Sequence, residues 1–136
     1  MPPLPIEQLP PVIVGELQDR VGRLPVRAVR NRLDWYAVCN NETKVVWRLA
    51  DEHQVSDDER YSLLSLHLDA CQAAVPEDAR ERDIPALERL EDSTLRLCHR
   101  RSYWLIRRLH PEGWPSWIGN RIVDVKAAQL RFTRKQ

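Results

Sequence analysis

His67 and Cys71 are the residues whose types and spacing come nearest to a metal site. They are four positions apart, so one face of a helix would present both an imidazole and a thiol. Cys98 and His99 would complete a four-ligand zinc site if a neighbouring helix brought them close. Structural zinc sites normally show tighter paired spacing, and burial explains both cysteines equally well. We therefore predict no metal and no other cofactor, with the zinc site as the less favoured alternative.

Enzymatic chemistry has little support elsewhere in the chain. A phosphate-binding loop needs several close glycines, but Gly113 and Gly119 are six residues apart with bulky side chains between them. No G-x-S-x-G elbow is present. The many carboxylates are more typical of a solvated helix surface than of an acid–base pair. We predict that the protein is not an enzyme; an enzyme that uses His67, His99 and nearby carboxylates is the third hypothesis.

The last third of the chain combines arginine with aromatic residues, and we expect binding there. Guanidinium groups beside exposed aromatic rings suit a nucleic-acid backbone with stacked bases. Our first hypothesis is a non-enzymatic helical protein that contacts the nucleic-acid backbone through this segment. The residues expected to make the contacts are Arg96, Arg100, Arg101, Trp104, Arg107, Arg108, Trp114, Trp117, Arg121 and Arg131.

Charge is segregated along the chain although its net value is only +1. Residues 1–48 carry +2, residues 49–92 carry −9 and residues 93–136 carry +8. Separate acidic and basic surfaces favour packing against a partner protein, and arginine and tryptophan are also the residues that dominate protein interfaces. Our second hypothesis is therefore a protein–protein adaptor, inhibitor or assembly subunit. A homo-oligomer is compatible with it. Another interpretation of the charge pattern is intramolecular pairing. In that case the basic last third of the chain neutralises the acidic middle and encloses the tryptophans, which would leave no binding surface.

Composition limits the class of protein. The chain has 136 residues, of which 43% are hydrophobic and 30% are charged, as expected for one globular domain. Only four glycines are present, which favours helices over sandwiches and doubly wound sheets. The three cysteines form no Cys-x-x-Cys pair, and no apolar run is long enough to span a bilayer. We expect a soluble, cytoplasmic protein without a membrane segment.

Local signals predict where the helices begin and end. Residues 1–11 read as an extended proline-rich arm, and residues 12–136 as a single helical domain. Apolar spacing predicts helices over 11–24, 25–41 and 42–53, the second ending near two asparagines. Ser56 and Glu59 form a capping box that opens a central, buried helix, which stops before Pro76. Residues 76–83 are expected to be a charged connection.

The rest of the chain completes an all-α prediction. A long helix is expected from Pro85 to Leu109, followed by a break and a further helix from Ser116. Alternation over residues 130–133 makes a short C-terminal strand the alternative there. Residues 49–63 are similar to a helix-turn-helix, but three carboxylates at the start of the second helix would repel DNA. We therefore predict a compact bundle of five or six helices without a major-groove reader.

Overall fold

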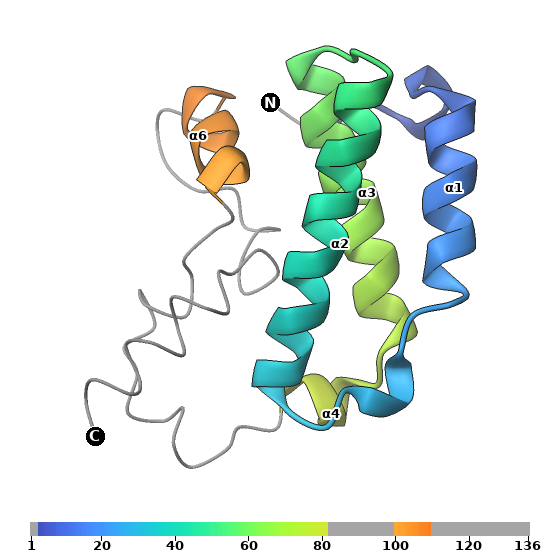
Figure 1. Cartoon of the computed structure of the whole chain (residues 1–136), viewed down its shortest axis with the longest axis vertical. Coiled ribbons are helices and arrows are strands. Elements are labelled where there is room, and N and C mark those ends of the chain that lie inside the picture. Colours follow the sequence, from blue (N-terminus) through green and yellow to red (C-terminus); the bar gives the residue numbers. More distant parts are fainter. Residues whose placement is uncertain (1–2, 82–99, 110–136) are drawn as a thin grey trace.

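The computed structural model describes residues 3–81 and 100–109. Three long helices, α1 (Pro11–Val21), α2 (Arg32–Glu52) and α3 (Asp57–Ala74), lie side by side (Figure 1). Short helical segments accompany them: η1 (Ile6–Gln8), η2 (Val26–Ala28), α4 (Glu77–Glu81) and α6 (Arg100–Leu109). The described residues contain no strand, so the all-α prediction is confirmed for them. The predicted helix after Ser116 and the alternative strand lie outside the described residues.

The arm before α1 lies against the bundle over the residues that are described. Leu9 is buried in the core, and the backbone N–H of Leu4 donates a hydrogen bond of 2.8 Å to Ser62 Oγ on α3. Pro11 occupies the first turn of α1, where its missing N–H costs nothing because that group has no partner within a helix. These contacts hold the beginning of the chain beside α1 and α3.

Helix α2 corrects the prediction of two helices that meet at residues 40–42. The structure has one helix of 21 residues, and its N-cap Asn31 accepts a hydrogen bond of 3.0 Å from the backbone of Asp34. Asn40 and Asn41 lie within this helix although asparagine is a poor helix former. Buried side chains on both sides of them, such as Cys39 and Val46, pack into the core. Tertiary packing therefore outweighs the local preference of the two asparagines for a turn.

Helix α3 confirms its predicted boundaries and its central position. The capping box is complete, because Ser56 Oγ accepts from the backbone N–H of Glu59 while the Glu59 carboxylate accepts from the backbone N–H of Ser56. The helix contacts both α1 and α2, so it is buried on several sides. Its buried residues are Tyr61, Ser62, Leu63, Leu64, Ser65, His67, Leu68 and Cys71.

The remaining predictions are met in part. Within the charged connection 76–83, the structure has a short helix, α4, which the sequence analysis did not predict. Helix α6 is the part of the expected 85–109 helix that the structure describes. Of the residues described, no helix is both long and apolar enough to cross a membrane. Helices α2 and α3 run side by side along their length, so residues 49–63 form a helical hairpin.

Candidate binding cleft beside helix α6

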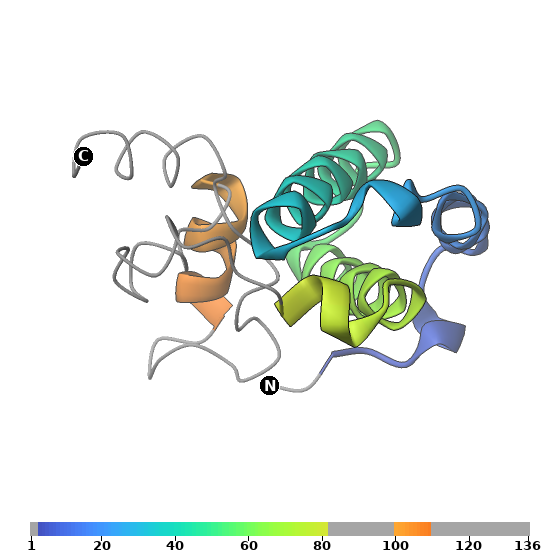
Figure 2. The same cartoon turned by 90° about the horizontal axis from the view of Figure 1, so that it is seen from below.

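Helix α6 is attached to the bundle through one buried face. Ser102 and Leu105, three residues apart, lie on that face and are almost completely buried. The indole Nε1–H of Trp47 on α2 donates a hydrogen bond of 2.7 Å to Ser102 Oγ. Two views show α6 beside the α2–α3 hairpin (Figures 1 and 2). The buried hydrogen bond and Leu105 therefore determine which residues of α6 face outward.

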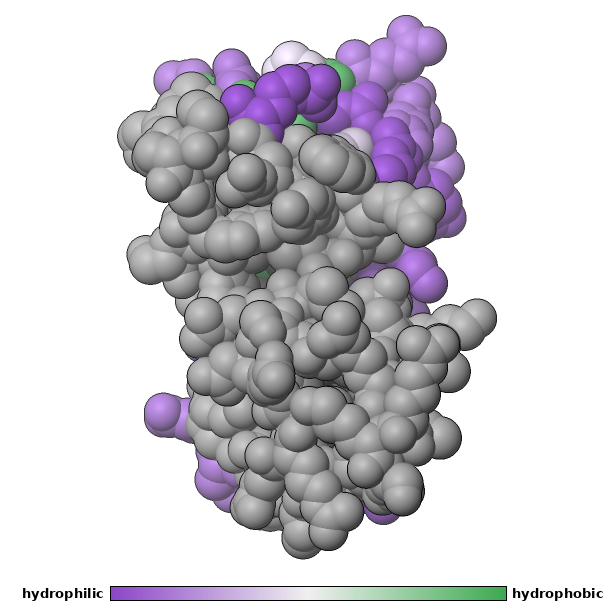
Figure 3. All heavy atoms as spheres, turned by 90° about the vertical axis from the view of Figure 1, so that its left-hand side faces the viewer, coloured by the Kyte–Doolittle hydropathy of each residue, from purple (hydrophilic) through white to green (hydrophobic). Residues whose placement is uncertain are grey.

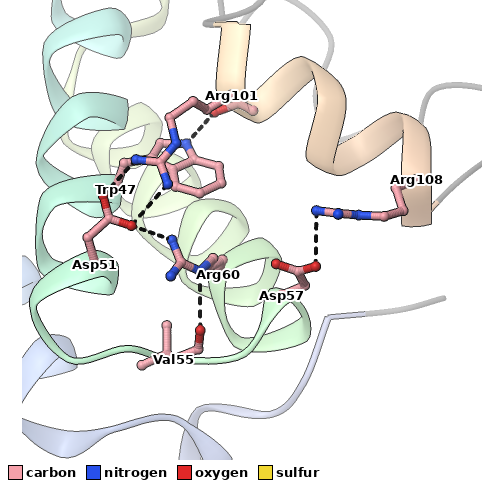
Figure 4. Close-up of polar contacts among 8 residues, drawn as sticks. Trp47, Asp51, Val55, Asp57, Arg60, Arg101 and Arg108 are labelled. Atoms are coloured by element: carbon pink, nitrogen blue, oxygen red, sulfur yellow. Dashed lines mark hydrogen bonds and ion pairs between the residues drawn. The ribbon is translucent and has the colours of Figure 1, made fainter.

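Arg101 is held by a stacked and doubly hydrogen-bonded arrangement (Figure 4). Its guanidinium carbon lies 4.2 Å from the centroid of the Trp47 ring, and two of its nitrogens donate to the Asp51 carboxylate at 2.6 and 3.0 Å. Planar stacking and forked donation are both properties of guanidinium that an ammonium group lacks. The hydrogen bonds from Arg101, and then those from Arg60, hold the pKa of Asp51 below its ordinary range.

Arg60 approaches the same carboxylate from α3. Its Nη1 donates to Asp51 at 2.6 Å, its Nε donates to the carbonyl of Val55 at 3.2 Å, and its guanidinium carbon lies 5.3 Å from the Trp47 centroid. Asp51 thus joins guanidinium groups from two helices. This small network ties α2, α3 and α6 together at one end of the bundle.

Arg108 makes the second ionic contact between α6 and the bundle. Its Nη2 lies 3.0 Å from Asp57 Oδ2 in the first turn of α3. The side chains of Arg101 and Arg108 remain 50% and 65% exposed. Because they are seven residues apart, or about two helical turns, both lie along one side of α6.

An open cleft of about 620 Å³ lies between these ionic contacts. Its walls carry the guanidinium groups of Arg60, Arg101 and Arg108, together with one carboxylate and several apolar side chains. We call it the α6 cleft and define it by its lining residues: Trp47, Val55, Ser56, Asp57, Arg60, Arg101, Leu105 and Arg108.

The structure brings together two of the predicted contact residues. Arg101 and Arg108 both line the α6 cleft, each in an ion pair with a carboxylate of the acidic middle segment. Arg100, Trp104 and Arg107 belong to α6, but only their backbone is described. The other predicted residues lie outside the described part of the chain: Arg96, Trp114, Trp117, Arg121 and Arg131.

The cleft residues on α2 and α3, and the carboxylate of Asp51 behind them, were not among the contact residues predicted from the sequence. Trp47 and Asp51 are four residues apart on α2, so they share one helix face. That spacing was a usable signal, since an indole followed by a carboxylate offers a stacking surface and an ion-pair partner to one arginine. The identity of that arginine, 50 positions beyond Asp51, had no local signal.

His67 and Cys71 share one buried face of α3, as their spacing predicted, and the third group beside them is Glu42 from α2. His67 Nε2 lies 2.8 Å from Glu42 Oε1 and 3.6 Å from Cys71 Sγ. Arg20 on α1 donates to both oxygens of Glu42, at 2.8 and 2.6 Å. Burial raises the pKa of Glu42, but hydrogen bonds from Arg20 and His67 outweigh it and lower the pKa to about 2. Cys98 and His99 lie outside the described residues.

This cluster is not arranged for nucleophilic catalysis. A Cys–His–carboxylate triad uses one ring nitrogen for the thiol and the other for the carboxylate. Here Nε2 faces both groups, while the buried Nδ1 has no hydrogen-bond partner among the described residues. Burial raises the pKa of the Cys71 thiol to about 12, which opposes thiolate formation. The cluster therefore does not support the third hypothesis.

Comparison with known proteins does not decide between the remaining hypotheses. No protein family model, curated protein or solved structure matches the chain. Function must therefore be argued from the geometry and charge of the site itself.

Proposed function

We propose that this protein is a non-enzymatic adaptor that holds an acidic segment of a partner protein in the α6 cleft. The observation that supports it most is that three guanidinium groups, from Arg60, Arg101 and Arg108, line one open cleft together with apolar side chains. Arginine and tryptophan are the residues most enriched among interface side chains that dominate binding energy. A carboxylate is the natural ligand of an exposed guanidinium fork.

Arg108 is the best anchor for such a segment. Its described contact to Asp57 involves Nη2 alone, and its side chain is 65% exposed. Exposed ion pairs contribute only about 0–1 kcal/mol, so a carboxylate of the partner can share or replace Asp57 at little cost. An apolar side chain of the same segment would then lie against Val55 and Trp47, which also line the cleft.

The mixed charge of the cleft favours a protein over a nucleic acid. Asp57 lines the cleft and Asp51 lies behind it, and both already pair with the three arginines. Little uncompensated positive charge is therefore left for the many phosphates of a nucleic-acid backbone, whereas a single carboxylate needs only one guanidinium edge. Trp47 is only 7% exposed and is covered by Arg101, so a base has little ring surface on which to stack. The described residues that are visible on this side of the molecule, along the top and the right-hand edge of the view, are mainly hydrophilic (Figure 3).

The nucleic-acid hypothesis now depends on residues outside the described part of the chain. Trp114, Trp117 and Arg121 belong to that group, and nothing in the geometry of the α6 cleft bears on them. Binding of nucleic acid is therefore the competing outcome in a test of the α6 cleft.

The test is a random-peptide display selection on the full chain, followed by titration of the enriched peptides. We expect enrichment of Asp or Glu next to an apolar residue. The double variant Arg101→Ala/Arg108→Ala should bind those peptides about tenfold or more weakly, because each truncated anchor removes roughly 1 kcal/mol or more. A labelled oligothymidylate titrated over a range of salt concentrations tests the competing outcome.

The matched control is Arg23→Ala/Arg27→Ala, which removes the same charge from exposed positions on the segment between α1 and α2. It should leave peptide binding unchanged. Arg108→Lys keeps the charge and the fold but loses the forked geometry, so it should also weaken binding. Peptides without acidic preference, or equal losses in both double variants, would refute the proposal. Tight, salt-dependent oligothymidylate binding by a chain that selects no acidic peptide would assign the site to nucleic acid.

A further inference from the structure

We propose that Glu42, His67 and Cys71 form a binding site for one zinc ion inside the bundle. This site is distinct from the α6 cleft, and it shares no residue with it. One donor atom from each residue, a carboxylate oxygen, an imidazole nitrogen and a thiol sulfur, lies within 4.8 Å of the other two. Zinc accepts all three of these donor types.

The separation of the two ligand atoms on α3 matches what a four-coordinate zinc ion requires. Zinc lies about 2.0–2.1 Å from histidine nitrogen and about 2.3 Å from cysteine sulfur, so a tetrahedral angle places N and S about 3.6 Å apart. His67 Nε2 and Cys71 Sγ are separated by 3.6 Å. The same bond lengths place N and O about 3.3 Å apart, so the 2.8 Å between Nε2 and Glu42 Oε1 would open by about half an ångström. The i,i+4 spacing on α3 supplies two ligands, and α2 supplies the third.

The hydrogen-bonding pattern without metal is incomplete, and this favours an ion at the centre. A single ring nitrogen cannot donate its proton to Glu42 and accept one from Cys71 at the same time. With Nε2 protonated, the Cys71 thiol finds no acceptor on the ring. The buried Nδ1 has no partner within the described residues, with or without a metal on Nε2, so it does not count for or against the site. A zinc ion would satisfy the carboxylate, Nε2 and the sulfur together.

Charge and protons balance with one released proton. Zinc binding converts the Cys71 thiol to a thiolate, and the proton goes to solvent. The neutral imidazole moves its proton from Nε2 to Nδ1, and Glu42 is already a carboxylate. The ligand set then carries −2 and neutralises Zn²⁺. Arg20 Nε donates to Oε1 at 2.8 Å, so zinc bound to Oε1 would replace or share that hydrogen bond. Arg20 Nη2 keeps its contact to the second carboxylate oxygen, Oε2, at 2.6 Å and so orients the ligand.

The test uses the full chain after removal of metal with a chelator. Zinc is titrated while the thermal midpoint is recorded, and Co²⁺ is titrated separately while the thiolate-to-cobalt charge-transfer absorption is recorded. We expect one ion per chain and a cobalt–thiolate band. With zinc at about 100 times its Kd, we expect a rise in Tm of about 5 °C or more. The same rise should reverse on addition of chelator.

Matched variants separate this site from nonspecific binding. Cys71→Ser should abolish the cobalt–thiolate band, and His67→Gln should lower metal affinity by about tenfold or more. Cys39→Ser replaces another fully buried cysteine, and His53→Gln replaces a histidine that is exposed; both should behave like the wild type. The wild-type titration needs no variant to fold. A wild-type chain with no cobalt–thiolate band and no rise in Tm with zinc would overturn the proposal, as would a band that survives Cys71→Ser.

Discussion

Thr43 is a single buried residue whose hydroxyl lacks a hydrogen bond within the described structure. Its hydroxyl oxygen is completely buried on α2 and has no hydrogen-bond partner among the described residues. A buried polar group without a partner costs about 1–3 kcal/mol. Ser102 is the contrasting case, because its buried hydroxyl accepts from the Trp47 indole. The two hydroxyls therefore make opposite contributions to the free energy of unfolding.

Thr43→Val is expected to raise the free energy of unfolding by about 1 kcal/mol. Valine keeps the shape and the β-branch of threonine, so helix propensity and packing change little, while the desolvated hydroxyl is removed. Equilibrium denaturation in urea measures the effect. Ser102→Ala is the control, and it should lower the free energy of unfolding because the Trp47 N–H loses its partner. A destabilised Thr43→Val chain would show that the hydroxyl is paired in solution.

At the scale of elements, the turn between α2 and α3 combines good hydrogen bonding with an unfavourable backbone angle. The N–H group of Gln54 donates to the carbonyl of Asp51, and that of Val55 donates to the carbonyl of Ala50, both at 3.2 Å. These two hydrogen bonds are the pair that defines a Schellman C-cap. Gln54 has a φ of 51°, in the left-handed region. Glycine is the residue usually found there, since a Cβ atom costs about 1 kcal/mol.

Gln54→Gly is expected to raise the free energy of unfolding by about 0.5–1 kcal/mol, or Tm by about 2–4 °C. The gain in the folded state exceeds the additional entropy that glycine gives to the unfolded chain. Thermal unfolding measures it, with Gln54→Ala as the control that keeps a Cβ and should change little. Equal Tm values for the glycine and alanine variants would contradict the assigned backbone angle.

The elements also show which kind of sequence signal is reliable. The Ser56 cap and the end of α3 before Pro76 were predicted correctly because each depends on a few adjacent residues. The break predicted at Asn40–Asn41 was wrong. The helix continues because Cys39 and Val46 are buried against other helices, and residues near the asparagines give no sign of that burial. Short α4 was missed because its charged sequence has no apolar periodicity.

At the scale of the whole molecule, the segregated charges meet within the described structure. Arg101 and Arg108 from the basic third pair with Asp51 and Asp57 from the acidic middle. Both pairs are about half exposed, so they attach α6 weakly and leave the guanidinium edges accessible. Intramolecular pairing of the basic and acidic segments is therefore observed for these two arginines, although both side chains remain partly exposed.

Acid is expected to loosen α6 because the pKa of Asp51 is lowered by Arg101 and Arg60. The stabilisation is complete above the ordinary aspartate range, near pH 4, and is lost as the pH falls toward the lowered value. The measurement is the NMR exchange rate of the Trp47 indole N–H. At pH 7 Asp51→Asn should exchange about two- to fivefold faster than the wild type. The two rates should begin to approach each other below about pH 4 and converge as the pH reaches the lowered pKa of Asp51.

Asp58→Asn is the control for this pH experiment, because Asp58 is exposed at the start of α3, outside the Asp51 network. It should follow the wild type at every pH. The ratio of the Trp47 indole exchange rates in the wild type and in Asp51→Asn is the decisive quantity. If that ratio stays constant from pH 7 down to strong acid, Asp51 does not hold α6.

The sequence alone determined the helical class of the described residues, the beginning of α1, both ends of α3, and the shared face of His67 and Cys71. Each of these follows from residues within one or two helical turns of one another. Only the tertiary structure placed Glu42 beside His67 and Asp51 beside Arg101, because those pairs are 25 and 50 positions apart. Contacts at such separations depend on how α2 lies against α3 and α6, and many side chains together decide that packing.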